Sequence, residues 1–276
     1  MSPLFSFIGR ALANYLSQPN PRFHPITTTV PEALAAAIRP GDVLLVEGDT
    51  RISTAIKYLT QSTWSHAALF VGNVTGHRSE TGEALDLIEA DIKEGVRLIP
   101  LGRYHNFHTR ICRPASLTPE DLQQVIRYVV SRIGQQYDLR NVIDLGRYLF
   151  PTPPVPIRWR RRMLALGSGE PTRAICSTLI AQAFQSVRYP ILPTIQRRPS
   201  DDPDCNDCYD EILHIRHHSL FAPRDFDISP YFDVVKPALT RDFDYRTLRW
   251  ANDGDHMPDT ATQGPVASAP ESTRSR

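Results

Sequence analysis

The chain has 276 residues, of which 41% are hydrophobic and 22% are charged. This composition can form a sizeable core, and it excludes wholesale disorder, collagen, a coiled coil and a polytopic membrane protein. The formal net charge is +1, which argues against a nucleic-acid-binding protein with a global basic field. Four cysteines are too few for a disulfide scaffold. We therefore expect a globular protein whose function depends on individual residues.

The two ends of the chain differ in character from the middle. Apolar residues recur at helical spacing in Met1–Gln18, which predicts an amphipathic helix, with a linker to residue 27. This helix either packs on the domain or lies in a membrane interface. Arg10 interrupts its apolar run and no basic residue precedes it, so we expect no secretory signal and a cytoplasmic protein, with peripheral membrane contact as the alternative. Residues 251–276 are small and polar and predict a disordered tail.

Between these ends the pattern predicts a mixture of strands and helices without regular alternation, which is typical of an α+β fold. The expected helices are Pro31–Arg39, Ile52–Leu59 (capped by Asp49 or Thr50), Thr118–Ile133 (capped by Thr118), Leu139–Phe150 and Ile175–Val187. The expected strands are Asp42–Glu47, His66–Gly72, Leu85–Ala90, Gly95–Pro100 and Arg110–Arg113. Arg188 to Leu239 is interpreted as loop-rich. We expect one domain over residues 28–250, with an insertion at about 139–172.

The most informative residue is Cys176, at the start of the predicted helix Ile175–Val187. Unpaired backbone amides at a helix N-terminus lower the pKa of a thiol, and they can also stabilise an oxyanion that forms when an acyl carbon is attacked. A buried structural cysteine is the simpler interpretation of such a residue taken alone. The position therefore makes Cys176 a candidate nucleophile that needs supporting residues.

A thiol nucleophile needs a base and a group that orients the base. His66 begins a strongly apolar strand, which would hold its ring firmly. Glu89 lies in the apolar strand Leu85–Ala90, where a charge needs a reason, and it can reach His66 if the two strands are neighbours. Asp91 is the competing orienting group, since it is two residues further on and points to the same face. We predict a Cys–His–carboxylate triad.

Four motifs in series resemble one known family. They are Pro40–Leu45 followed by Trp64–Gly72, then Ile88–Ala90, then Gly134–Asp138 and finally Cys176–Ser177. In this order they are similar to the circularly permuted NlpC/P60 proteins of the YiiX/YebB type, which are papain-like cysteine hydrolases in which the histidine precedes the cysteine. Pro223–Pro237 resembles the closing element of the family more loosely. The resemblance implies a permuted papain-like α+β fold with a small antiparallel sheet and a helix that carries the nucleophile.

The resemblance also implies roles for residues: Cys176 as nucleophile, His66 as general base and acid, Glu89 as orienting group, and Tyr137 as a tyrosine near the nucleophile that binds the oxyanion. It implies hydrolysis of an amide or other acyl bond, as in cell-wall peptides, without metal or organic cofactor. A lipid acyltransferase or thioesterase is the alternative enzyme, and a non-catalytic binding module that retains the cleft is the alternative class. The long stretch between Tyr137 and Cys176 departs from the family pattern, so substrate preference is expected to differ.

Two further clusters have weaker signals. Cys205 and Cys208 precede His214, His217 and His218, which suggests zinc, but the gap from Cys208 to His214 is shorter than the ~12 residues of a finger. A reversible disulfide or plain loop cysteines fit this pattern better. The basic block Arg158–Arg162 is interpreted as a solvated face or, together with the N-terminal helix, as a contact with anionic lipid. We expect a peptide, amide or acyl-lipid substrate and no nucleic-acid partner.

Overall fold

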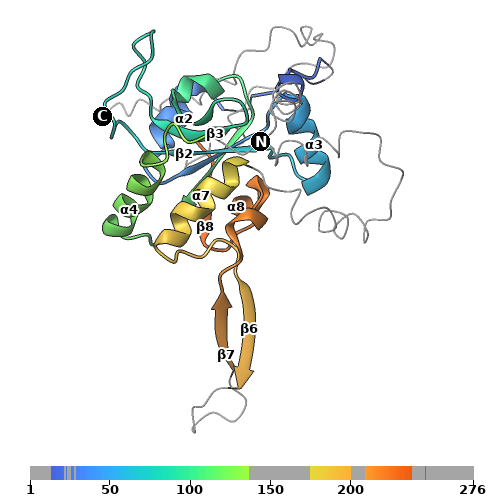
Figure 1. The fold of residues 1–276 in the computed structure, drawn as a ribbon, viewed down its shortest axis with the longest axis vertical. Helices are drawn as coiled ribbons and strands as arrows, with labels where there is room; N and C mark the ends of the chain where they lie inside the picture. Colours follow the sequence, from blue (N-terminus) through green and yellow to red (C-terminus); the bar gives the residue numbers. More distant parts are fainter. Residues whose placement is uncertain are drawn as a thin grey trace, which may run out of the picture.

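The structure is a computed structural model that describes residues 14–21, 23, 26–27, 29–136, 175–199, 209–237 and 246. Its centre is an antiparallel sheet of six strands in the order β4-β3-β2-β1-β5-β8 (Figure 1). The strands are β1 (Val43–Val46), β2 (His66–Phe70), β3 (Leu87–Asp91), β4 (Gly95–Ile99), β5 (Thr109–Pro114) and β8 (Phe232–Val235). β2 is therefore flanked on both sides by other strands, with β1 on one side and β3 on the other.

Four described helices lie close to their predicted ranges: α2 (Pro31–Ala37), α3 (Arg51–Thr60), α4 (Pro119–Val130) and α7 (Ile175–Ser186). The short helix α8 (Pro223–Asp227) and the 3-10 turns η1 (Leu101–Tyr104) and η3 (His218–Leu220) were not predicted. The hydroxyl of Thr50 accepts from the Ser53 amide and that of Thr118 from the Asp121 amide. These bonds pair backbone donors that the first turn leaves open, which fixes where α3 and α4 begin. Of the two predicted caps for α3, the structure uses Thr50.

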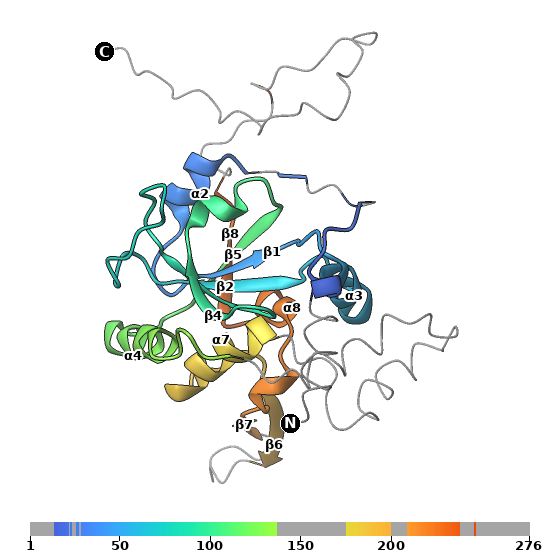
Figure 2. The same cartoon turned by 45° about the horizontal axis from the view of Figure 1, so that its top comes forward.

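Side chains of the central strands alternate between two apolar layers, because successive residues of a strand point to opposite faces. Val43, Leu45 and Ile88 lie in the layer that includes residues of α4 and α7, whereas Leu44 and Leu87 lie in the layer that includes residues of α2 and η1. Figure 2 shows α2 on one side of the sheet and α4, α7 and α8 on the other. All four residues of β1 are buried, as expected of a strand covered on both faces.

A buried ion pair holds β1 and β5 in place. Asp42 is 1% exposed, and its two oxygens accept from Nε (2.9 Å) and Nη2 (2.7 Å) of Arg113. The amide of Arg39 donates to the same carboxylate at 2.8 Å. A buried carboxylate is tolerated where it is paired and hydrogen-bonded in this way. The pair therefore links the residue before β1 to β5, and β1 is the strand that pairs with β2.

The interpretation of Arg188–Leu239 as loop-rich is wrong for much of that segment. A hairpin of β6 (Thr194–Pro199) and β7 (Tyr209–His214) projects from the body (Figure 1), and β8 adds the last strand to the main sheet. The hairpin was missed because Ile195 and Leu213, opposite each other in its register, are both about half exposed. A hairpin that buries no face need not alternate apolar and polar residues, so the period-2 signal is weak.

Several predictions fall on residues that the structure does not describe. The helix Leu139–Phe150, the insertion at 139–172 and the tail at 251–276 all lie outside the described residues. Of the N-terminal helix, the described part is Asn14–Leu16, which is helical, and Leu16 is fully buried. Among the described residues, no helix combines the length and hydropathy needed to cross a membrane.

Candidate active site

His66 is the first residue of β2, and the backbone around it is held on both sides. The Ser65 hydroxyl accepts from the Gly48 amide at 2.9 Å, and Ser65 itself is 2% exposed. The register places His66 opposite Val46 of β1. The imidazole has 22% of its surface exposed, so it is anchored in the sheet while one edge reaches the cleft.

Glu89 contacts the ring of His66. It lies opposite Ala68 in the β2–β3 register, and strand side chains two apart share a face, so His66 and Glu89 lie on the same side of the sheet. Nε2 of His66 is 2.7 Å from Oε2 of Glu89, whose side chain is 2% exposed. Asp91, the other predicted candidate, instead accepts the amides of Lys93 and Glu94 at 2.7 and 3.0 Å. Glu89 is therefore the carboxylate that contacts the histidine.

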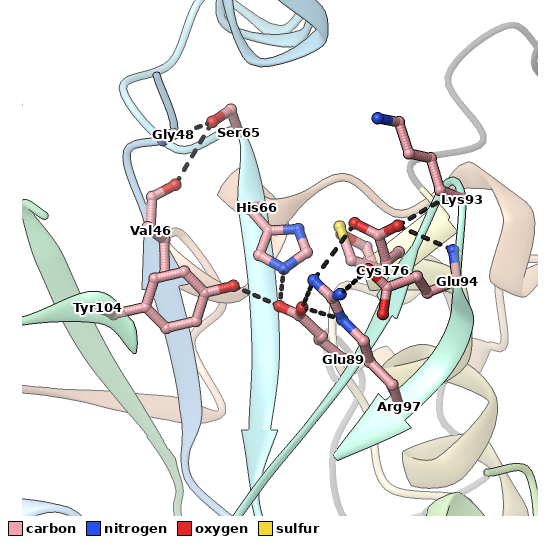
Figure 3. A network of polar contacts seen from close by, with 12 residues as sticks. Val46, Gly48, Ser65, His66, Glu89, Lys93, Glu94, Arg97, Tyr104 and Cys176 are labelled. Carbon is pink, nitrogen blue, oxygen red and sulfur yellow. Dashed lines mark hydrogen bonds and ion pairs between the residues drawn. The ribbon is translucent and has the colours of Figure 1, made fainter. Parts of the chain in front are cut away.

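Cys176 comes from α7, which packs against β2 and β3. Its thiol lies 3.9 Å from the Ser177 hydroxyl, and Cys176 lines the same cleft as His66. Because Nε2 of His66 is taken by Glu89, Nδ1 is the ring nitrogen that remains for the thiol. The three predicted triad residues therefore meet, with His66 between Cys176 and Glu89 (Figure 3).

The charges of this trio stabilise one another. Burial by itself raises the pKa of the Cys176 thiol, but the charge and hydrogen bond of His66, with the Ala67 backbone and Ser177, lower that pKa below its usual value. Burial alone would lower the pKa of His66, and the Cys176 and Glu89 charges raise it instead. Against its own burial, Glu89 has a lowered pKa because of His66, Tyr104 and Arg97. Each charge of the trio therefore favours the ionised form of its neighbour.

Two residues that the sequence analysis did not single out also contact Glu89. Arg97 of β4 places Nε 2.8 Å and Nη2 2.7 Å from Oε1, and the phenol of Tyr104 donates to Oε2 (Figure 3). The sequence contained a signal for Arg97. The predicted strands Leu85–Ala90 and Gly95–Pro100 are close enough in the chain to form a tight hairpin, and in the β3–β4 register Arg97 is opposite Glu89. Tyr104 lies in η1, a turn that no sequence periodicity indicated.

A cleft of about 540 Å³ contains the site. Its lining includes Cys176, His66 and Glu89 together with Ile52 and Ile56 from α3. The β3–β4 turn and η1 contribute charged and aromatic side chains: Asp91, Lys93, Glu94, Arg97, Arg103, Tyr104 and Phe107. One side of the cleft is thus apolar and the other carries charges. A pocket of this size, with a few convergent polar groups, is typical of a small-molecule or peptide site.

The remaining predicted site residues are in part outside the described residues and in part elsewhere in the fold. Tyr137, Cys205 and Cys208 lie outside the described residues, as does Arg158–Arg162. His214 contacts Gln196 at 2.9 Å, and His218 contacts Gln182 at 3.3 Å. In the part of the chain that the structure describes, no group of three or more His, Cys, Asp or Glu side chains could hold a metal ion.

A family model described as permuted papain-like amidase enzyme, YaeF/YiiX, C92 family, matches residues 37–148. Over these residues the chain is similar to that family. The segment is less than half of the 276 residues; it contains His66 and Glu89, whereas Cys176 lies beyond it. The family resemblance and the permuted papain-like α+β fold predicted from the sequence are confirmed, and the likeness to this amidase family implies a hydrolase that acts on an amide or peptide bond.

One solved structure resembles the chain more distantly. It is the crystal structure of the metalloprotein YiiX from Escherichia coli O157:H7, with 14% sequence identity and a TM-score of 0.40. The likeness covers 78% of this chain and 98% of that one. A comparison with curated proteins gives no match. The likeness to the amidase family therefore depends on the sequence match over residues 37–148.

Proposed function

We propose that the protein is a thiol hydrolase in which Cys176 attacks an amide or other acyl bond, His66 transfers the proton, and Glu89 orients His66. The observation that carries this proposal is that Cys176, His66 and Glu89 line one cleft, with Nε2 of His66 2.7 Å from Glu89. A nucleophile, a base and a group that orients the base are the parts that covalent acyl transfer requires. Cell-wall peptides are the proposed substrates, by analogy with the family.

In the first half-reaction the Cys176 thiolate attacks the acyl carbon, and the carbonyl electrons move to oxygen. Backbone amides at the start of α7 stabilise that oxyanion in the proposal, because their donors are unpaired within a helix. The oxyanion then collapses, the C–N bond breaks, and Nδ1–H of His66 protonates the departing amine. A thioester on Cys176 and a neutral His66 remain. Glu89 keeps Nε2–H in place throughout, so that Nδ1 faces the reaction.

In the second half-reaction neutral His66 removes a proton from water, and the resulting hydroxide attacks the thioester. The C–S bond breaks, the carboxylic acid leaves, and the thiolate–imidazolium pair is restored. An acyl-lipid substrate is the second candidate, because Ile52 and Ile56 give the cleft an apolar side that fits an acyl chain. Hydrolysis of muropeptides compared with hydrolysis of lipid esters separates the two substrates.

The proposal predicts selective labelling of Cys176 by a thiol-directed alkylating probe at pH 7. Cys176 should react at least about tenfold faster than Cys112, because thiolate is the nucleophile and burial raises the pKa of Cys112 to about 12. His66→Ala should lower the Cys176 rate about tenfold or more. Site-resolved mass spectrometry of the full chain measures both rates.

The matched control for this experiment is His108→Ala. His108 is also a partly buried histidine beside a glutamate, with Nδ1 3.3 Å from Oε2 of Glu47, but it lies outside the cleft. Its replacement should leave the Cys176 rate within about twofold of wild type, since it does not contact the thiol. Equal, slow labelling of all four cysteines would instead support the non-catalytic binding module.

A further inference from the structure

The carboxylate of Glu89 is contacted by three side chains from three elements. Oε2 accepts from Nε2 of His66 and from the Tyr104 phenol, and Oε1 accepts from Nε of Arg97. Nη2 of Arg97 lies 2.7 Å from the same Oε1 as an ion-pair contact. Both oxygens of the carboxylate therefore accept hydrogen bonds, and the guanidinium places a positive charge beside them.

From these contacts we propose that Arg97 and Tyr104 are positioning residues that hold Glu89 ionised and fixed, so that His66 presents Nδ1 to Cys176. We call Glu89, Arg97 and Tyr104 the carboxylate clamp. This inference rests on the proposed function, since it assigns the clamp a role only if Cys176 and His66 react. Neither residue touches the reacting atoms in the proposed mechanism.

Burial is what makes the clamp necessary. Glu89 is 2% exposed and belongs to the layer lined by Tyr104, which is itself 7% exposed. An isolated carboxylate in such a place would take up a proton, because burial disfavours the charged form. A protonated Glu89 could not accept Nε2–H of His66 in the same way. The paired guanidinium and the phenol therefore preserve the acceptor that orients the ring.

Charge compensation gives a second reason for Arg97. His66 lies between two negative groups, the Cys176 thiolate and Glu89. The Arg97 guanidinium neutralises Glu89, which limits how strongly that carboxylate opposes ionisation of the thiol. Without Arg97 the cluster carries one more net negative charge, and every proton in it is held more tightly. The pKa values of both Cys176 and His66 should then rise.

Other charged groups face the same cluster and set the background for this effect. Arg97 also contacts Glu94 at 2.6 Å and Asp91 at 3.5 Å, both from the β3–β4 hairpin. Arg103 of η1 acts on Tyr104 through its charge. Arg97 is the cation that is hydrogen-bonded to Glu89, with its side chain 17% exposed. Substitution of Arg97 should therefore affect the pKa of Glu89 more than substitution of Glu94, Asp91 or Arg103.

The test is the pH dependence of Cys176 alkylation by iodoacetamide in the full chain, resolved by mass spectrometry. In Arg97→Gln we expect the midpoint of the acid limb to move up by about one pH unit, which is about a tenfold lower rate below the midpoint. Tyr104→Phe should move it in the same direction by a smaller amount, because a dipole is lost rather than a charge. Arg97→Lys should restore part of the shift.

Two control variants remove a guanidinium and a phenol that lie outside the cleft. Arg113→Gln breaks the ion pair with Asp42, and Tyr189→Phe removes a phenol bonded to the backbone oxygens of Ala115 and Tyr231. Both should lower stability without moving the Cys176 profile. Profiles of Arg97→Gln and Tyr104→Phe that coincide with wild type, or with these controls, overturn the inference.

The outcome for wild type separates this inference from the proposed function. If wild-type Cys176 titrates like an ordinary thiol, or if His66→Ala leaves its profile unchanged, the proposed function itself fails. If wild type shows the lowered, His66-dependent midpoint and the clamp variants do not shift it, only the clamp fails. Arg97→Lys and Tyr104→Phe retain most of the side-chain volume, so they keep the test informative should Arg97→Gln fail to fold.

Discussion

Replacing Cys176 with alanine should lower kcat by at least about 10⁴-fold, because the covalent route through a thioester is lost with the thiol. The thiol lines the same cleft as His66, and none of the other described residues places a thiol there. Stability should change little by comparison, since Cys176 contributes a small side chain to the apolar layer. Turnover of a muropeptide or a chromogenic acyl-peptide anilide measures the effect.

Cys112→Ala is the matched control for this variant. Cys112 is fully buried in the same apolar layer, but it lies on β5 and takes no part in the cleft. We expect its loss to lower the free energy of unfolding by about 1 kcal/mol, as for a small cavity, and to leave kcat within about twofold. A Cys176→Ala protein that retained a tenth of wild-type kcat would contradict the assignment of the nucleophile.

Glu89→Gln should be the most damaging single change that preserves side-chain shape. A carboxamide has one oxygen and one NH2 group, so in either orientation its NH2 meets a donor from Arg97 or from His66 and Tyr104. We expect the free energy of unfolding to fall by about 3 kcal/mol, because a buried charge pair loses one partner. We expect kcat to fall by about 10²- to 10⁴-fold, because His66 is no longer oriented.

Chemical denaturation at several pH values tests the stability part of this prediction. The folded-state pKa of Glu89 lies below its unfolded value, so its contribution is present above the unfolded pKa and is lost as pH falls toward the folded one. The difference in stability between wild type and Glu89→Gln should therefore shrink below about pH 4. A difference that stays constant with pH would contradict the ionised state of Glu89.

Asp91→Asn is the control that decides between the two carboxylates. Asp91 lies on the same strand two residues further on, and an asparagine oxygen can still accept the amides of Lys93 and Glu94. Its kcat should remain within about threefold of wild type. An effect as large as that of Glu89→Gln would restore Asp91 as the orienting group.

Each residue of the predicted triad has a local signal in the sequence. His66 and Glu89 are charged or polar residues in apolar strands, and Cys176 begins a helix with a long apolar face. Their meeting depended on β2 and β3 being neighbours, which the sequence could only suggest. Period-2 and period-3.6 patterns report which face of an element is buried, but they do not report which elements are adjacent.

Sequence periodicity did not indicate the carboxylate clamp or the projecting hairpin. Tyr104 reaches Glu89 from a short 3-10 turn, whose position follows from the packing of Leu101 and Tyr104 on the sheet rather than from a repeating pattern. Likewise β6 and β7 pair through backbone hydrogen bonds with their side chains largely exposed. Features that depend on long-range contacts or on backbone pairing alone leave little trace in hydrophobic periodicity.

The most direct test of the account is to trap the acyl-enzyme. The full chain would be incubated briefly with muropeptides or with lipid esters, quenched in acid and digested, and the peptide that contains Cys176 analysed by mass spectrometry. We predict an acyl adduct on Cys176 that hydroxylamine removes at neutral pH, as a thioester requires, and that is absent in Cys176→Ala. Two results would contradict the central claim. One is product formation with the acyl adduct on another residue. The other is product formation without any adduct on Cys176, even in His66→Ala, where slower deacylation should let the thioester accumulate.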